Sequence, residues 1–199
     1  MGTNHKLLSL VGGLSVVLLG TACASDGSDA APSEAARSQA APSIAVVGAQ
    51  SPDKGLKAVK AATARYHSIE QAKADGYTGV DEPCVASPEG AMGIHYVNPA
   101  LLQDPALDPL RPEILLYVPS ANGKLKLVGV EYWKADADQK LDTREDEPTL
   151  LDQPFGAPME GHAPGMPVHY DLHVWLFKDN PAGMFAPFNP TLTCPPAAS

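Results

Sequence analysis

The apolar residues between Ser51 and Gly76 recur at the spacing of one helix face. Those that form the stripe, three or four positions apart, are Leu56, Val59, Ala62, Tyr66, Ile69 and Ala72. Pro52 suits a first helical turn, and Gly76 suits the position just after a helix end. The pattern therefore predicts one helix that begins near Pro52 and ends at Asp75.

Beyond this helix the apolar positions alternate as they do on β-strands. Residues 91–98 alternate in this way, and residues 98–112, which contain four prolines, predict a loop. Residues 113–119 and 124–133 flank a four-residue turn that ends in Asn122-Gly123, a pair that can adopt positive φ. These two segments predict a β-hairpin.

The second strand of this hairpin contains a carboxylate, and its face depends on the regularity of the strand. With strict alternation, Glu131 shares a face with Leu125 and Leu127 and needs a partner there. Gly129 could instead mark a β-bulge, which would reset the alternation. The pattern leaves both faces open for Glu131.

The last strand pattern starts at Val168 and contains the densest group of polar candidates. Alternation places the apolar side chains of Val168, Tyr170, Leu172, Val174 and Leu176 on one face. The other face carries His169, Asp171, His173 and Trp175. A polar face of this kind suits a binding site better than a dry core.

Together these elements predict a single α+β domain over residues 51–199, with an N-terminal helix packed on a mostly antiparallel β-sheet. Its connections are long and rich in Pro and Gly. The charge-dense residues 134–147 lack the glycine and closing glutamate of an EF-hand, so they predict a solvated connection rather than a calcium loop. About 145 residues is ample for one hydrophobic core.

The N-terminus has the features of an export signal. Lys6 precedes the apolar run Leu7–Leu19, which is too short to predict a membrane-spanning helix. The string LGTAC, ending at Cys23, resembles the lipobox of bacterial lipoproteins, although Gly20 stands where that family most often has leucine. The alternative is an ordinary secretory signal cleaved near Ala22.

The lipobox resemblance implies that residues 1–22 are a signal peptide and that Cys23 carries the lipid, including palmitate. It also implies a membrane anchor on the extracytoplasmic face of the cell membrane. Residues 23–50 are mostly Ala, Ser, Asp, Gly and Pro, a composition that predicts a disordered tether.

The formal net charge of −9, without a basic run, excludes nucleic acid as a partner.

Cys84 and Cys194 remain once Cys23 is assigned to the lipid. In an exported protein an isolated pair of cysteines predicts a disulfide bond. The alternative, a thiolate metal site, has little support because Cys84 has no partner at CxxC spacing.

Histidines and a carboxylate on predicted strands form a candidate metal site. His95, Glu131, His169 and His173 are ligand types that proteins use for Zn, Fe, Mn or Cu. Positions i and i+4 of a regular strand lie about 13 Å apart, too far to share one ion. We therefore expect only one of His169 and His173 to join His95, with Glu131 or His162 as a further ligand.

The methionines bear on the choice of metal. Met92, Met159 and Met166 each stand three positions before a histidine. Thioethers beside imidazoles outside the cytoplasm favour copper over zinc, although methionine also fills gaps in ordinary cores. Met166, His162 and Asp171 are possible additional site residues.

Three functions are compatible with these residues: a site for a transition metal or small ligand, a surface-tethered interaction module, or a metal-dependent enzyme. In the interaction module the same His, Tyr and Glu residues would form a structural hydrogen-bond network. Serine hydrolase chemistry has no support, because no GxSxG motif is present.

The strings MGIHYVNP, LVGVEYW and GMPVHYDLHVWLFKDNPAGMFAPFNP resemble an uncharacterised family of exported bacterial proteins. The resemblance spans roughly residues 60–194. It implies an extracytoplasmic location and nothing about mechanism.

Overall fold

The computed structural model describes residues 52–80 and 84–195. The predicted signal peptide, the predicted tether and Cys23 lie outside these residues. Within the two described ranges, no helix combines the length and apolar character needed to cross a membrane.

Three helical pieces occupy the region where the sequence predicts one helix. They are α1 (Pro52–Thr63), the 3-10 helix η1 (Ala64–His67) and α2 (Ile69–Ala74). The predicted helical region is therefore confirmed, but the structure divides it into three pieces. The Ser68 hydroxyl caps α2 by accepting a hydrogen bond from the backbone N–H of Gln71. The Tyr66 carbonyl accepts a bond of 2.6 Å from the Tyr117 hydroxyl of the sheet, so tertiary contacts hold the break in place.

The predicted stop at Gly76 is confirmed. Gly76 adopts a φ of +99°, which side chains with a Cβ rarely tolerate. The Gly76 N–H donates to the carbonyl of Lys73, and the Tyr77 N–H donates to the carbonyl of Ala72. These two bonds form a Schellman motif, which ends the helix and turns the chain toward the sheet.

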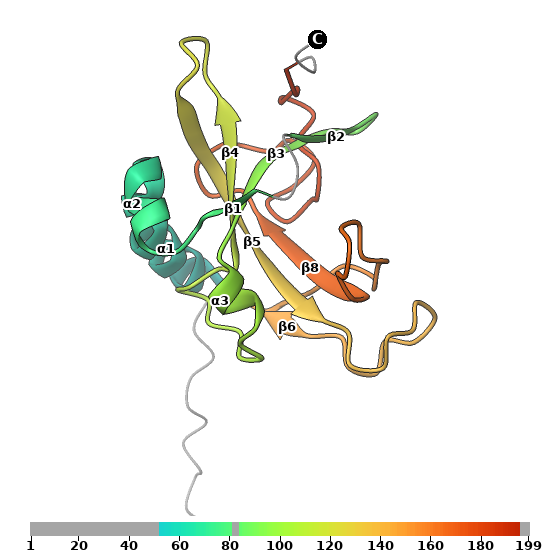
Figure 1. Ribbon diagram of the computed structural model, residues 1–199. Coiled ribbons are helices and arrows are strands. Elements are labelled where there is room, and N and C mark those ends of the chain that lie inside the picture. The colour runs from blue at the N-terminus through green and yellow to red at the C-terminus, as the bar shows by residue number, and fades with distance from the viewer. Residues whose placement is uncertain (1–51, 81–83, 196–199) are drawn as a thin grey trace, which may run out of the picture. The chain divides into compact units, whose positions relative to one another are not determined.

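A six-stranded antiparallel sheet forms the centre of the described chain (Figure 1). Its strands are β1 (Gly79–Val80), β2 (Val85–Ser87), β3 (Gly90–Val97), β4 (Ile114–Pro119), β5 (Leu125–Ala135) and β8 (His169–Val174). Strands β1 and β2 both pair with β3, and the order continues β4, β5, β8. A separate pair is formed by β6 (Thr149–Leu150) and β7 (Gln153–Pro154). The domain is α+β, as predicted.

The hairpin between β4 and β5 is confirmed, and it contains a bulge. Gly123 takes a φ of +77° in the turn. Leu116 pairs with Gly129 and Tyr117 with Leu127, so Val128 is an extra residue in β5. The bulge resets the alternation, as Gly129 allowed, and moves Glu131 to the face opposite Leu127.

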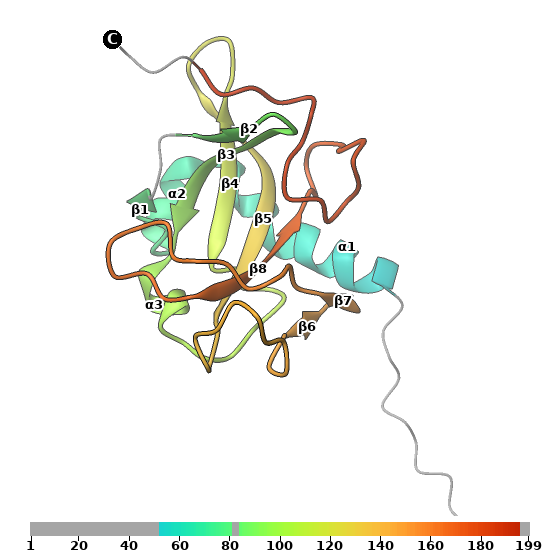
Figure 2. The same ribbon diagram turned by 90° about the vertical axis from the view of Figure 1, so that its right-hand side faces the viewer.

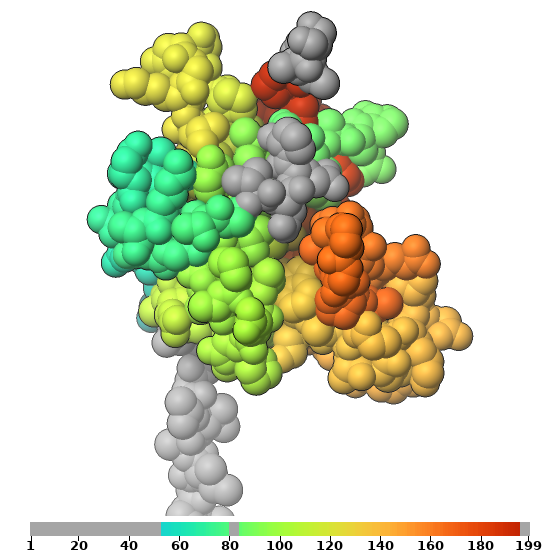
Figure 3. Space-filling model, viewed as in Figure 1, coloured from blue at the N-terminus to red at the C-terminus, as the bar shows by residue number. Residues whose placement is uncertain are grey.

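The two faces of the sheet are both covered. The helical region lies against one face, where the core includes Val59, Leu115, Tyr117, Leu127, Val130, Tyr132, Tyr170, Leu172 and Val174. A smaller apolar cluster on the other face consists of Val97, Ile114, Leu116, Val128 and Trp175. Figures 1 and 2 show the helices on one face and residues 156–168 on the other. We call residues 156–168 the covering segment; Figure 3 shows it as a block away from the helices.

A short helix, α3 (Pro99–Leu102), lies within the stretch that the sequence predicts as a loop. The Asn98 side chain caps it by accepting hydrogen bonds from the backbone N–H groups of Ala100 and Leu101. The capping places Leu101 in the helix-side core, while Leu102 packs with the smaller cluster.

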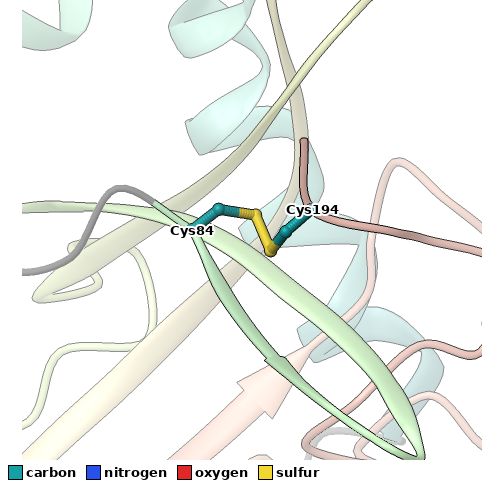
Figure 4. The surroundings of a disulfide bond; sticks show 2 residues. All are labelled: Cys84 and Cys194. Atoms are coloured by element: carbon teal, nitrogen blue, oxygen red, sulfur yellow. A yellow bond between two sulfur atoms is a disulfide. The ribbon is translucent and has the colours of Figure 1, made fainter. Parts of the chain in front are cut away.

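Cys84 and Cys194 form a disulfide bond, as predicted (Figure 4). Their Cα atoms are 5.6 Å apart, and 110 positions separate them in the sequence. Nearby, Ala91 and Asn189 exchange two backbone hydrogen bonds of 3.2 and 3.1 Å. The C-terminal segment is thus fastened to β3, and the thiolate metal site is excluded because both sulfurs are bonded to each other.

Candidate metal centre

Three strands each contribute one side chain to a cluster on the sheet face away from the helices. His95 comes from β3, Glu131 from β5 and His173 from β8. Glu131 and His173 are direct cross-strand partners, which brings their side chains together. Strand β4 separates His95 from them, but the long imidazole and carboxylate side chains reach across it.

The potential ligand atoms of this cluster converge on one point. One ligand atom from each of the three side chains lies within 4.8 Å of the other two. Glu131 Oε2 is 3.0 Å from His95 Nε2 and 3.4 Å from His173 Nε2. Such spacing matches two imidazoles and a carboxylate around a single ion.

All three side chains are buried, and both imidazoles approach the Glu131 carboxylate. The exposed fractions of His95, Glu131 and His173 are 8, 4 and 2 %. His95 Nε2 lies at hydrogen-bonding distance from Glu131 Oε2, whereas His173 Nε2 has no hydrogen-bond partner among the residues that the structure describes. Because a buried polar atom without a partner is costly, a compensating group at this position would be favoured.

The electrostatics of the cluster keep Glu131 ionised. Burial raises the pKa of Glu131, but the positive charges of His173 and His95 outweigh that effect and hold this pKa below its usual range. Burial lowers the pKa of His173, although the negative charge of Glu131 opposes this shift. An ionised carboxylate is the form that coordinates a cation, and a metal ion at this site would take the place of the protons on the imidazoles.

His169 lies outside the cluster. Its ring stacks on Trp133 with a centroid distance of 5.4 Å, and the ring of His162 is 5.3 Å away. Its Nδ1 is 3.1 Å from the Pro167 carbonyl oxygen, a geometry in which Nδ1–H would donate. The structure therefore separates His169 from His173, in agreement with the distance argument for a regular strand.

A cavity of about 220 Å³ opens beside the cluster. It is lined by Val85, Met92, His95, Leu102, Ile114, Glu131, Trp133, Met159, His162, Met166 and Asp171. The additional candidates Met166, His162 and Asp171 thus lie on the cavity wall, outside the set of three converging ligands. Because His95 and Glu131 belong to both groups, the cluster faces the cavity.

Two further buried carboxyl groups lie near the cluster. Burial raises the pKa of Asp171 to about 7, and the charge of Glu131 adds to the shift. Burial likewise raises the pKa of Glu113 to about 7, while Glu113 Oε2 accepts a bond of 3.2 Å from the backbone N–H of Trp133. Sequence reasoning missed Glu113, because a glutamate that starts a strand normally lies in solvent and no local pattern marks it as buried.

No protein-family model, curated protein or solved structure matches this chain. Its function must therefore be inferred from the cluster of His95, Glu131 and His173 and from the cavity that this cluster faces.

Proposed function

We propose that the protein is a lipid-anchored, extracytoplasmic metal-binding protein. The ion would be held by the imidazoles of His95 and His173 and by the carboxylate of Glu131. The observation that carries this proposal is the convergence of three buried ligand atoms, of which His173 Nε2 has no hydrogen-bond partner among the described residues. A cation would give His173 Nε2 a partner and compensate the buried negative charge of Glu131.

The ligand set narrows the choice of metal. Two imidazoles and one carboxylate suit zinc or copper, and three protein ligands leave a coordination position open. The thioethers of Met92, Met159 and Met166 on the cavity wall favour copper. The open position would face the cavity, because two of the three ligands line it.

The proposed location rests on the N-terminal sequence and on the disulfide. Residues 1–22 have the pattern of a lipoprotein signal, with Cys23 at the lipidation position. The disulfide between Cys84 and Cys194 is typical of oxidising compartments. A tether of about 27 residues would hold the domain roughly 25–30 Å from the bilayer on average.

The same geometry supports a metal-dependent enzyme as a second candidate function. Asp171 lines the cavity, and burial raises its pKa to about 7, a value suited to proton transfer near neutral pH.

A structural role, by contrast, explains the position of His169. Its ring stacks on Trp133, and its Nδ1 lies beside the Pro167 carbonyl oxygen.

Metal binding is tested by the metal content of the purified protein after loading with copper or zinc. We expect about one ion per chain in the native protein, and at least a tenfold loss of affinity in Glu131→Gln because the anionic ligand is removed. Glu113→Gln is the matched control, since it changes a second buried carboxylate that lies outside the converging ligands. Equal affinity for metal in the native protein and Glu131→Gln, measured by titration, would contradict the assignment.

Lipid attachment is tested by metabolic labelling with palmitate in a bacterial host. We expect Cys23→Ala to lose the label and to leave the membrane fraction, because the thiol that accepts the lipid is absent. Gly20→Leu, which places the commonest lipobox residue at that position, should retain the label. A Cys23→Ala protein that still carries palmitate would show that the anchor lies elsewhere.

A further inference from the structure

The cavity beside the proposed metal site has mainly apolar walls. Its apolar lining comes from β2, β3, α3, β4, β5 and the covering segment, with Val85, Met92, Leu102, Ile114, Trp133, Met159 and Met166. Its volume of about 220 Å³ exceeds the roughly 150 Å³ of an apolar cavity that accommodates benzene. The space therefore suits a ligand with one small ring or a short chain.

The side chain of Trp133, which lines the cavity, also has a polar atom that lacks a partner. The indole Nε1 of Trp133 is buried and has no hydrogen-bond partner among the described residues. A buried N–H donor without an acceptor is costly, so a ligand that brings an acceptor atom would be favoured. Trp133 and Glu131 lie two positions apart on β5, on the same face of the sheet.

The charge of the loaded site favours an anionic acceptor. A divalent ion together with the Glu131 carboxylate leaves one positive charge in a buried site, and a carboxylate ligand would neutralise it. The ligand carboxylate would therefore lie at the metal end of the cavity, where the ion balances its charge.

We propose that this cavity binds a small apolar monocarboxylate. One carboxylate oxygen coordinates the open position of the metal, and the carboxylate accepts a hydrogen bond from the indole N–H of Trp133. The hydrocarbon part lies among Met92, Leu102 and Ile114. This inference rests on the proposed function, because it requires the metal held by His95, Glu131 and His173.

The test is calorimetric titration of the zinc-loaded protein with three probes of similar shape: benzoate, benzamide and toluene. Benzoate should bind at least tenfold more tightly than benzamide, because only benzoate neutralises the site. Toluene, which has no acceptor atom, should bind more weakly still. Removal of zinc with a chelator should weaken benzoate binding at least tenfold and leave toluene binding unchanged.

Trp133→Phe tests the second contact of the carboxylate. It should weaken benzoate binding by about tenfold, the effect of removing one hydrogen bond to a charged acceptor, without weakening toluene binding. Trp175→Phe is the matched control, because the indole N–H of Trp175 donates to the Ala186 carbonyl at 2.6 Å, outside the cavity lining. Each variant is loaded with zinc and its metal content measured before the titration.

The outcomes separate the two proposals. A protein that takes up no zinc or copper would overturn both the proposed function and this inference. A zinc-loaded protein that does not bind benzoate, or binds benzamide or toluene as tightly, would overturn the monocarboxylate ligand alone. Undiminished benzoate binding by Trp133→Phe would also overturn it.

Discussion

Replacement of both Cys84 and Cys194 by serine is expected to lower the melting temperature of the domain by about 10–15 °C. The disulfide closes a loop in which the two cysteines are 110 positions apart. On the chain-entropy view, a crosslink over such a loop stabilises the folded state by about 4–5 kcal/mol. For a domain of this size each kcal/mol corresponds to a few degrees in the melting temperature.

Reduction of the native protein provides the control for this prediction. In thermal melts, reductant should lower the melting temperature of the native protein to that of the double serine variant. The melting temperature of the variant should be the same with and without reductant. Without the disulfide, the C-terminal segment should unfold first. The two backbone hydrogen bonds between Ala91 and Asn189 would still connect it to β3, but they are weaker than a covalent bond. Two free thiols in non-reduced protein would show that the bond does not form.

His173→Ala is expected to abolish stabilisation of the domain by metal, whereas His169→Ala is not. A metal at a thousand times its dissociation constant stabilises a folded protein by about 4 kcal/mol. That gain should disappear in His173→Ala, because one of the three ligands is lost. His169→Ala should cost about 1–3 kcal/mol with or without metal, since its ring stacks on Trp133, lies beside His162 and approaches the Pro167 carbonyl, outside the metal cluster.

Melting curves in chelator and in added copper or zinc distinguish the two variants. The two substitutions are chemically identical and lie on the same face of the same strand, so each serves as the control for the other. If metal raised the melting temperature of both variants as much as that of the native protein, His173 would not be a ligand. If metal raised the melting temperature of none of the three proteins, the polar residues would form only a structural network.

The features that the sequence predicts correctly depend on local pattern. Alternation on β3 and β8 places His95 and His173 on defined faces, and the strand rise separates His173 from His169. The turn at Asn122-Gly123 determines the β4–β5 hairpin, and Gly76 ends the helical region. Each of these properties is specified within a few neighbouring residues.

The features that the sequence does not predict depend on distant contacts. The helix break follows partly from the Tyr117 hydroxyl, which reaches the Tyr66 carbonyl from a distant strand. The burial of Glu113 and the choice among the histidines follow from the order β3-β4-β5-β8. Strand order results from the packing of whole elements, so no single stretch of residues specifies it.

The extra residue of β5 determines which changes in strand length the site tolerates. Val128 is accommodated as a bulge, so Leu127 and Glu131 occupy opposite faces of one strand although four positions separate them. An in-frame deletion of the Val128 codon would leave a regular strand that keeps both residues on these faces, because Leu127 and Gly129 already pair with consecutive residues of β4. Insertion of one more codon, if the strand does not absorb it as a second bulge, would force either Leu125 and Leu127 out of the helix-side core or Glu131 away from the histidines. Inheritance of this site thus depends on the number of codons between Leu127 and Glu131 as well as on the identity of the ligands.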